Sequence, residues 1–361
     1  MKKSLLTLSL LILFNLSYAG RPRFSFFCEL PNKQFNELFS DSALIGQLFK
    51  MQVSVRIGLH DFSPERTLTI QKLNQAGIPI VAWLLLPEED GYWFNMYNGE
   101  KAVKRYAGFK SWTAENQLKW EGIGIDLEPD MNDAKLAVSH PWKMAWKAYK
   151  RLYDTHSLKE GKAIYQMLIS TMKADGYLVE SYIMPYIYEE RVKKTTSLQK
   201  LLGIIDIETE KEIPMAYTSL FDNPDIIPLY HQDKMPIALG STGGGVAIEG
   251  IELKSMSWDK LERDILVASK LTGEIHIFCL ETSVQKGFLT KIESINFDQK
   301  EPDIQTSITK QKKMNGTVRF ILIILDHPFL LTIVILVIVI TVVWGLYRLG
   351  KSIIKKIRSS Q

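Results

Sequence analysis

Apolar, β-rich runs alternate with helix-like segments along most of the chain. The eight runs are Arg23 to Leu30, Val53 to Leu59, Ile78 to Leu86, Gly122 to Glu128, Tyr177 to Pro185, Ile213 to Ser219, Met235 to Gly240 and Glu274 to Glu281. Between most of them lie helical patterns, such as the segment that Ser63 opens and Gly77 closes, and the segment from Ser257 to Leu271. Strands that alternate with helices favour a parallel sheet, and eight of them favour closure into a (β/α)8 TIM-type barrel. An open, doubly wound sheet is the alternative, although no dinucleotide-binding glycine motif follows the first run.

The N-terminus has the pattern of a cleaved secretory signal. Lys2 and Lys3 precede an apolar run from Leu5 to Leu16, and small residues ending in Ala19 follow it. The run is short for a membrane span, so cleavage after Ala19 is favoured over an uncleaved anchor. This pattern predicts an exported protein.

The C-terminal region predicts a single membrane-spanning helix. The segment from Phe329 to Tyr347 is uncharged and apolar over about the length that a bilayer requires. Basic residues without any acid follow it in the tail from 348 to 361, which places the tail in the cytoplasm and the rest of the chain outside. A buried core helix is the alternative, but the basic tail argues against it. The polar stretch before the span indicates a tether, and Phe320 to Leu325 is expected at the membrane surface.

These boundaries divide the 361 residues into five parts. We expect a signal peptide at 1–19, an extracytoplasmic barrel at 20–292, a tether and juxtamembrane segment at 293–328, a transmembrane helix at 329–347 and a basic cytoplasmic tail at 348–361. The net charge of +4 owes much to the tail. The outer domain is therefore near neutral, and nothing in its charge favours nucleic acid as a partner.

The two cysteines are Cys28, in the first predicted strand, and Cys279, in the last. These strands are neighbours in a closed barrel, so the two residues are expected side by side. In an oxidising compartment they could form a disulfide, and two buried free thiols are the alternative.

The clearest chemical signal is the fourth predicted strand, which ends in acids at alternate positions. Asp126, Glu128 and Asp130 follow the apolar run Gly122-Ile123-Gly124-Ile125. Side chains at alternate positions of a strand share one face, and acids at the carboxyl end of a barrel strand lie where such enzymes keep their chemistry. The sequence therefore predicts an acidic site at the mouth of the barrel.

This strand resembles the fourth strand of the chitinase-like family 18 glycoside hydrolases, which ends in Asp-x-x-Asp-x-Asp-x-Glu. Glu121, Gly124, Asp126 and Glu128 occupy the four motif positions here, so the terminal Asp-x-Glu is kept and the second acid is missing. The family's Met-x-Tyr-Asp on strand six corresponds to Met215-Ala216-Tyr217-Thr218, which again lacks the acid. The family's Ser-x-Gly-Gly on strand three and its tryptophan on strand eight have no match.

The resemblance implies a hydrolase of glycans, with polymers of N-acetylated amino sugars as the expected substrates. Glu128 would be the general acid, and crowding by neighbouring acids would raise its pKa. In the substrate-assisted mechanism of that family, Asp126 would orient the acetamido group of the sugar and Tyr217 would hydrogen-bond it. If a protein nucleophile acts instead, the barrel offers three other acids, namely Glu281, Glu180 and Glu29.

Further candidates surround this predicted site. The loop after the third strand carries Tyr92 and Trp93, which could stack on sugar rings or simply pack on the barrel. No histidine and cysteine spacing implies zinc, and no cofactor is indicated, although the acids from Asp126 to Asp130 could hold a hard cation. The glycine-rich segment 241–245 could bind phosphate or form a turn.

Two further patterns bear on the outer surface and on activity. Trp142, Trp146 and Tyr149 have helical spacing, which predicts a packed helix face. The missing acids at Gly124 and Thr218 favour the competing function, a catalytically inactive barrel that binds glycan or protein at the cell envelope.

Overall fold

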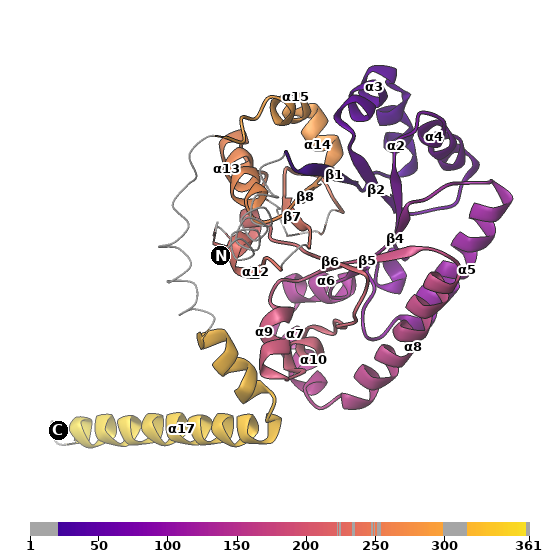
Figure 1. Cartoon of the computed structure of the whole chain (residues 1–361). Coiled ribbons are helices and arrows are strands. Elements are labelled where there is room, and N and C mark those ends of the chain that lie inside the picture. The colour runs from indigo at the N-terminus through magenta and orange to yellow at the C-terminus, as the bar shows by residue number, and fades with distance from the viewer. Residues whose placement is uncertain are drawn as a thin grey trace, which may run out of the picture.

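The chain folds into a (β/α)8 TIM-type barrel followed by one long apolar helix (Figure 1). The computed structural model describes residues 21–221, 223, 225–232, 235–246, 248, 250, 254–298 and 316–358. The predicted signal peptide, most of the tether and the end of the tail lie outside these residues. The strands are β1 (Arg23–Cys28), β2 (Ser54–Leu59), β3 (Ile80–Leu84), β4 (Gly122–Leu127), β5 (Leu178–Ile183), β6 (Lys211–Pro214), β7 (Ile237–Gly240) and β8 (Glu274–Phe278).

Helices follow the strands and cover the outside of the barrel. They are α2 (Asn32–Ser40), α3 (Ser42–Met51), α4 (Pro64–Gln75), the 3-10 turn η1 (Glu88–Asp90), α5 (Gly99–Glu115), α6 (Met131–Ser139), α7 (Pro141–Arg151), α8 (Thr155–Ala174), α9 (Ile187–Lys193), α10 (Ser197–Leu202), α11 (Thr218–Phe221), α12 (Ile226–Tyr230), α13 (Trp258–Ser269), α14 (Leu280–Gln285), α15 (Phe288–Glu293) and α17 (Pro328–Arg358). The two helices singled out in the sequence, α4 and α13, begin after Ser63 and Ser257 as predicted.

The sheet closes, which confirms the barrel and excludes the open sheet. All neighbouring strands pair in parallel, in the order β6-β5-β4-β3-β2-β1-β8-β7. The two ends meet through a parallel bridge between Met215 and Ala238, where the Ala216 amide donates to the Ala238 carbonyl over 2.9 Å. The sixth strand ends at Pro214, earlier than predicted, because residues from Thr218 begin the short helix α11.

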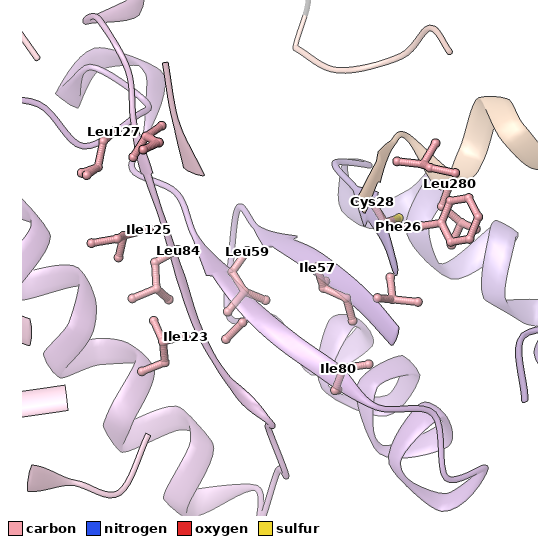
Figure 2. Close-up of a cluster of buried hydrophobic side chains, with 14 of the residues drawn as sticks. Phe26, Cys28, Ile57, Leu59, Ile80, Leu84, Ile123, Ile125, Leu127 and Leu280 are labelled. Carbon is pink, nitrogen blue, oxygen red and sulfur yellow. The ribbon is translucent and has the colours of Figure 1, made fainter. Parts of the chain in front are cut away.

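Strand alternation separates two apolar layers. Phe26, Ile57 and Ile125 belong to the layer between the strands and the covering helices (Figure 2). Residues of opposite parity, such as Phe27 and Tyr182, fill the interior of the barrel. Asp126 therefore projects inward because it alternates with Ile125 and Leu127 on β4.

The two cysteines occupy neighbouring strands across the seam of the barrel. Phe27 pairs with Phe278, so Cys28 and Cys279 follow at the next positions. Both side chains are buried and both thiols are free. The prediction of adjacent strands is thus confirmed, and the structure contains no bond between the two sulfurs.

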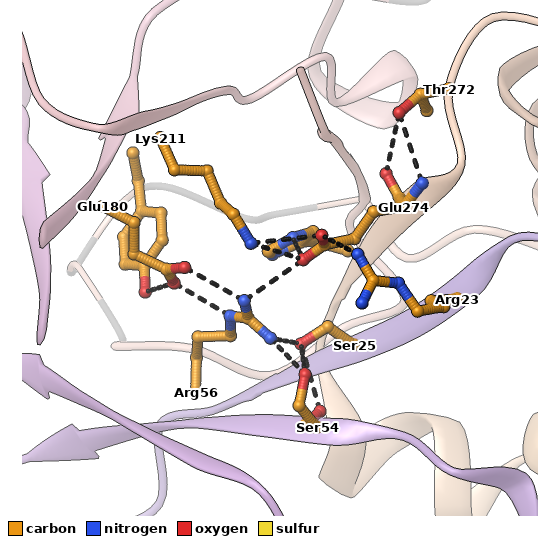
Figure 3. A network of polar contacts seen from close by, with 10 residues as sticks. Arg23, Ser25, Ser54, Arg56, Glu180, Lys211, Thr272 and Glu274 are labelled. Atoms are coloured by element: carbon orange, nitrogen blue, oxygen red, sulfur yellow. Dashed lines mark hydrogen bonds and ion pairs between the residues drawn. The ribbon is translucent and has the colours of Figure 1, made fainter. Parts of the chain in front are cut away.

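The barrel interior near the amino ends of the strands holds a polar network (Figure 3). The guanidinium of Arg56 binds both carboxylate oxygens of Glu180, at 2.9 and 3.0 Å, and its Nη2 lies 3.4 Å from Glu274. Tyr182 donates to Glu180 over 2.7 Å. Burial alone would raise the pKa of Glu180, but the charge and hydrogen bonds of Arg56, together with His276 and Tyr182, outweigh it and lower that pKa.

The C-terminal part of the chain leaves the barrel beside α7. Within the described residues, Pro328–Arg348 is the one helix long and apolar enough to cross a membrane, and its apolar stretch is not buried against the barrel. A shorter apolar helix, Gly316–Leu325, precedes it and buries Leu322 against the barrel. Ser197 donates to the Leu322 carbonyl over 2.9 Å, so this segment is held by the barrel as well as by the chain that follows it.

Candidate functional site

A cavity of about 270 Å³ opens at the carboxyl ends of the strands. Its lining combines acids, aromatic rings and apolar side chains, and comprises Phe27, Glu29, Trp83, Trp93, Asp126, Glu128, Pro129, Ala134, Tyr182, Met215, Tyr217, Leu220, Ser241, Gly245, Val246, Ile248 and Phe278. A largely apolar pocket with a few converging polar groups is the usual form of a small-ligand or catalytic site. Five residues predicted from the sequence meet here: Glu29, Trp93, Asp126, Glu128 and Tyr217.

Asp126 and Glu128 form a carboxyl pair at the end of β4. Asp126 is 3% exposed, and burial raises its pKa well above the usual range, with the charges of Glu128 and Glu29 adding to the effect. Burial raises the pKa of Glu128 to about 7, and its hydrogen bond with Asp126 opposes part of that rise. Burial thus raises the pKa values of both carboxyls, and Glu128, with its pKa of about 7, exchanges its proton near neutrality, as a general acid must.

A buried carboxyl and a neighbouring indole in the cavity wall are poorly hydrogen-bonded. Within the described part of the chain, Oδ1 of Asp126 and the indole Nε1 of Trp83 make no hydrogen bond of acceptable geometry. Buried polar groups in proteins are nearly always paired, and unpaired ones concentrate at functional sites. The Trp83 indole acts on the Asp126 carboxyl and opposes part of the rise in its pKa, so these two groups are neighbours in the wall.

Glu29, at the end of β1, is a third carboxyl in the cavity wall. The Tyr92 hydroxyl donates to its Oε1 over 2.7 Å, and the Val246 amide donates to its Oε2 over 3.1 Å. Burial raises the pKa of Glu29 to about 8, against these two hydrogen bonds and with the help of the Glu281 and Glu128 charges. Glu29 is therefore largely neutral at pH 7.

The loop after β3 is fixed to the acidic strand. The Phe94 amide donates to the backbone carbonyl of Asp126 over 2.9 Å, and Phe94 forms a parallel bridge with Leu127. This anchoring buries Tyr92 behind Glu29 and leaves Trp93 half-buried at the cavity. The two rings meet edge to face with centroids 5.2 Å apart. Tyr92 thus supports an acid, whereas Trp93 offers surface to a ligand.

Tyr217 lies across the cavity from β4, after the end of β6. Burial raises the pKa of its hydroxyl, and the nearby charges of Asp126, Glu128 and Glu29 raise it further. Its ring packs on Phe278 with centroids 5.8 Å apart. The hydroxyl is therefore neutral and can donate a hydrogen bond beside the carboxyl pair.

Four predicted residues lie outside the cavity lining, and Tyr92, which supports Glu29 from behind, is one of them. Glu180 is deeper in the barrel and is held by Arg56. Asp130 caps α6, where its carboxylate accepts from the Asn132 amide over 2.8 Å. Glu281 is buried beside the two cysteines, and burial raises its pKa.

The two motif positions without acids have a structural explanation. A Cβ atom at Gly124 would lie 2.1 Å from the Tyr182 hydroxyl, so the phenol occupies the space of any side chain there. Thr218 donates a hydrogen bond to Asp264 of α13, which turns it toward the helix layer. The space of the missing acid at Gly124 is thus taken by the Tyr182 phenol, which hydrogen-bonds Glu180 of the ion pair with Arg56.

Sequence reasoning did not identify the aromatic floor of the cavity. Phe27, Trp83 and Tyr182 meet edge to face, with centroids 4.7 to 5.9 Å apart, and Phe278 lies beside them. The alternation of Phe27 with buried Phe26 and Cys28 is compatible with either face, so only closure of the barrel shows which ring points inward. Ser241 and Gly245 of the glycine-rich segment also line the cavity.

The described residues contain no group of three or more histidine, cysteine, aspartate or glutamate side chains placed to hold a metal ion. Among the acids of the cavity, Glu29 accepts a hydrogen bond from Tyr92, and Asp126 interacts with Glu128. What the arrangement supports chemically is proton transfer beside an aromatic surface.

Comparisons with known proteins place the fold in context. No protein-family model matches the chain, and no significant match is found among curated proteins. Similar solved structures include a GH18 chitinase from Pseudoalteromonas aurantia, at 12% identity over 75% of this chain and 98% of that one, with a TM-score of 0.42. Another is Saccharomyces cerevisiae Gas2p in complex with laminaritriose and laminaritetraose, at 9% identity over 81% of this chain and 69% of that one, with a TM-score of 0.40. The chain's own strand order establishes its barrel, and similarity at this level assigns it no activity.

Proposed function

We propose that this chain is a membrane-anchored, extracytoplasmic glycoside hydrolase-like protein in which Glu128 is the general acid. The carboxyl pair of Asp126 and Glu128, placed in an aromatic cavity with a pKa of about 7 for Glu128, carries this proposal. Cleavage of a glycosidic bond needs an acid that is still protonated near neutral pH and can donate to the leaving oxygen. Aromatic rings such as Trp93 would bind the faces of the sugars.

The protonation of the cavity favours substrate assistance over a protein nucleophile. Burial raises the pKa of Glu29 to about 8 and raises the pKa of Asp126, which disfavours their ionised forms, and Glu128 is needed as the acid. Glu180 is the ionised acid of the barrel interior, but Arg56 and Tyr182 occupy its oxygens. An attacking acetamido group of the substrate would remove the need for an ionised carboxylate, with Asp126 orienting that group and Tyr217 hydrogen-bonding it. N-acetylated amino-sugar polymers are therefore the proposed substrates.

The membrane anchor is a second part of the proposal. The span from Pro328 to Arg348 is apolar, unburied and followed by basic residues, which supports a cytoplasmic tail and an outer barrel. The exported position agrees with the signal pattern that ends at Ala19. Envelope glycans are the polymers such a barrel would meet.

A non-catalytic, glycan-binding barrel is the second candidate function. The observation that favours it is the absence of acids at Gly124 and Thr218, where the Tyr182 hydroxyl and Asp264 take up the available contacts. Such a protein would use the same cavity, with Asp126 and Trp83 in its wall, to hold a sugar without cleaving it.

The test is release of reducing ends from chitin-type oligomers and purified envelope glycan by the full chain in detergent. We expect cleavage by the native protein and a loss of about two to four orders of magnitude in turnover for Glu128→Gln, the usual contribution of a general acid. Glu121→Gln is the matched control because Glu121 is exposed before β4, and it should retain full activity. Binding without cleavage by the native protein would support the second candidate instead.

A further inference from the structure

Helix α7 carries an aromatic face that the barrel does not cover. Trp142 is 87% exposed and Trp146 is 59% exposed, which corrects the sequence-based prediction of a packed face. Trp146 stacks on Tyr149, with ring centroids 5.4 Å apart and an angle of 21° between the rings. Two indole rings, one turn apart on the same helix, are thus exposed to solvent.

The aromatic face runs directly into the start of the apolar helix α17. The Tyr149 hydroxyl lies 2.6 Å from Oγ1 of Thr332, in the first turns of α17. Tyr153, just after α7, donates to the Pro328 carbonyl over 3.1 Å, and its ring meets Phe329 edge to face at 5.5 Å. The row from Trp142 to Tyr153 is therefore continuous with the point where α17 would enter a bilayer.

The charged residues of α7 itself are all basic. The sequence of α7, Pro-Trp-Lys-Met-Ala-Trp-Lys-Ala-Tyr-Lys-Arg, has four basic residues and no acid. Lys147 and Arg151 pair with the buried Asp133 of α6, while Lys143 and Lys150 are exposed beside the rings. Exposed lysines next to tryptophan and tyrosine match the phosphate and interfacial layers of a membrane.

We infer that α7 is an interfacial helix whose face of Trp142, Trp146 and Tyr149 inserts into the outer surface of the bilayer that α17 spans. The inference rests on the proposed membrane anchor and is independent of the proposed hydrolase activity. Trp and Tyr side chains concentrate at the boundary between lipid tails and headgroups because their rings are apolar and their N–H and O–H groups stay hydrated. Lys143 and Lys150 would reach the lipid phosphates.

The same geometry separates this face from the sugar site. Ala134 of α6 lines the cavity, whereas Asp133 of the same helix pairs with α7. Trp142 and Trp146 therefore lie one helix away from the cavity and are not part of its aromatic lining. Docking of α7 would hold the mouth of the barrel close to the membrane surface, so the substrate would be glycan located next to the bilayer.

The experiment uses the full chain in phospholipid nanodiscs, with lipids that are either plain or brominated near the top of the acyl chains. Bromine quenches tryptophan fluorescence only at short range. The starting variant is Trp344→Phe, which removes the tryptophan of the membrane helix itself. We expect brominated lipid to quench this variant, and we expect that quenching to be lost when Trp142→Phe and Trp146→Phe are added. Trp258→Phe, on the half-buried side of α13, is the matched control and should leave the quenching unchanged.

Two results would overturn the inference. Brominated lipid that fails to quench the Trp344→Phe variant, or quenches it equally after the double substitution, would place α7 away from the membrane. Protection of Trp142 and Trp146 from a water-soluble quencher by added chitin-type oligomers would instead assign the face to sugar binding. Insertion of α17 is measured separately, as the part of the quenching in the native chain that is lost in Trp344→Phe. The experiment therefore distinguishes a chain whose α17 does not enter the bilayer from one in which only α7 stays away from it.

Discussion

The ion pair between Arg56 and Glu180 provides a quantitative test of the barrel interior. The side chains of Arg56 and Glu180 are 3% and 1% exposed, and two hydrogen bonds of 2.9 and 3.0 Å join them. Replacing Arg56 with Met leaves Glu180 as a buried charge, with the Tyr182 hydroxyl as its remaining described donor. Loss of one partner from a buried pair costs about 3–5 kcal/mol, so Arg56→Met should lower the free energy of unfolding by that amount at pH 7.

The reverse substitution should cost less. In Glu180→Gln, the guanidinium of Arg56 keeps Glu274, whose Oε1 lies 3.4 Å from Nη2. We expect a cost of about 1–3 kcal/mol for Glu180→Gln, typical of one unsatisfied buried hydrogen-bonding group. The double variant Arg56→Met with Glu180→Met removes both charges and should be more stable than Arg56→Met alone.

The loss of stability in Arg56→Met should depend on pH. Arg56 holds the pKa of Glu180 below the ordinary value of 4.5, and without it burial raises that pKa above 4.5. When the pKa of a carboxyl is higher in the folded than in the unfolded protein, its protonation adds to the stability of the fold. This contribution is complete below the unfolded-state pKa and is lost as the pH rises through the folded-state pKa. The defect of Arg56→Met should therefore shrink at pH 4 relative to pH 7. Urea unfolding of the full chain in detergent, followed by tryptophan fluorescence, measures these differences, and additive, pH-independent losses would refute the account of the network.

Three further predictions concern the site and the topology. Asp126→Asn should reduce turnover on an amino-sugar oligomer more than Tyr217→Phe does, because Asp126 orients the acetamido group and opposes part of the rise in the pKa of Glu128, whereas Tyr217 supplies one hydrogen bond. Steady-state rates of the two variants compare them, and a larger effect of Tyr217→Phe would contradict the assignment. Gly124→Ala should lower the unfolding free energy by about 1–3 kcal/mol because its methyl group meets the Tyr182 hydroxyl, and an unchanged urea midpoint would show that the space is open. Protease added to intact spheroplasts should digest the barrel and spare an epitope placed after Arg348, whereas loss of the epitope alone would reverse the topology.

The barrel was predictable because each strand is recognisable from the composition of a few neighbouring residues. Runs such as Gly122 to Leu127 are apolar and β-branched, and Ser63 and Gly77 delimit α4 by chemistry that acts within a few residues. The inward direction of Asp126 follows from alternation once the strand is placed in a closed barrel. The adjacency of Cys28 and Cys279 follows from closure between β1 and β8.

Other features depend on contacts that no local pattern encodes. Glu180 resembles Asp126 in being an acid on an inward position, and only the approach of Arg56 from β2 makes it part of an ion pair. Trp142 and Trp146 have the spacing of a buried stripe, but α6 already fills the space between α7 and the barrel, so they remain exposed. The sequence leaves Tyr92 open to stacking on sugars or to packing on the barrel, and the turn at Gly91 buries it against Glu29.

The central claim, that Glu128 donates the proton, is tested most directly by the pH dependence of kcat/KM for an amino-sugar oligomer. The protonated form of Glu128 is present below its pKa of about 7 and is lost as the pH rises through that value. The native protein should therefore lose activity above an apparent pKa near 7, about tenfold per pH unit at higher pH. Glu128→Gln, which has no proton to lose, should show a low rate without this descending limb. A native rate that stays flat from acidic to alkaline pH, or the same limb in Glu128→Gln, would contradict the assignment.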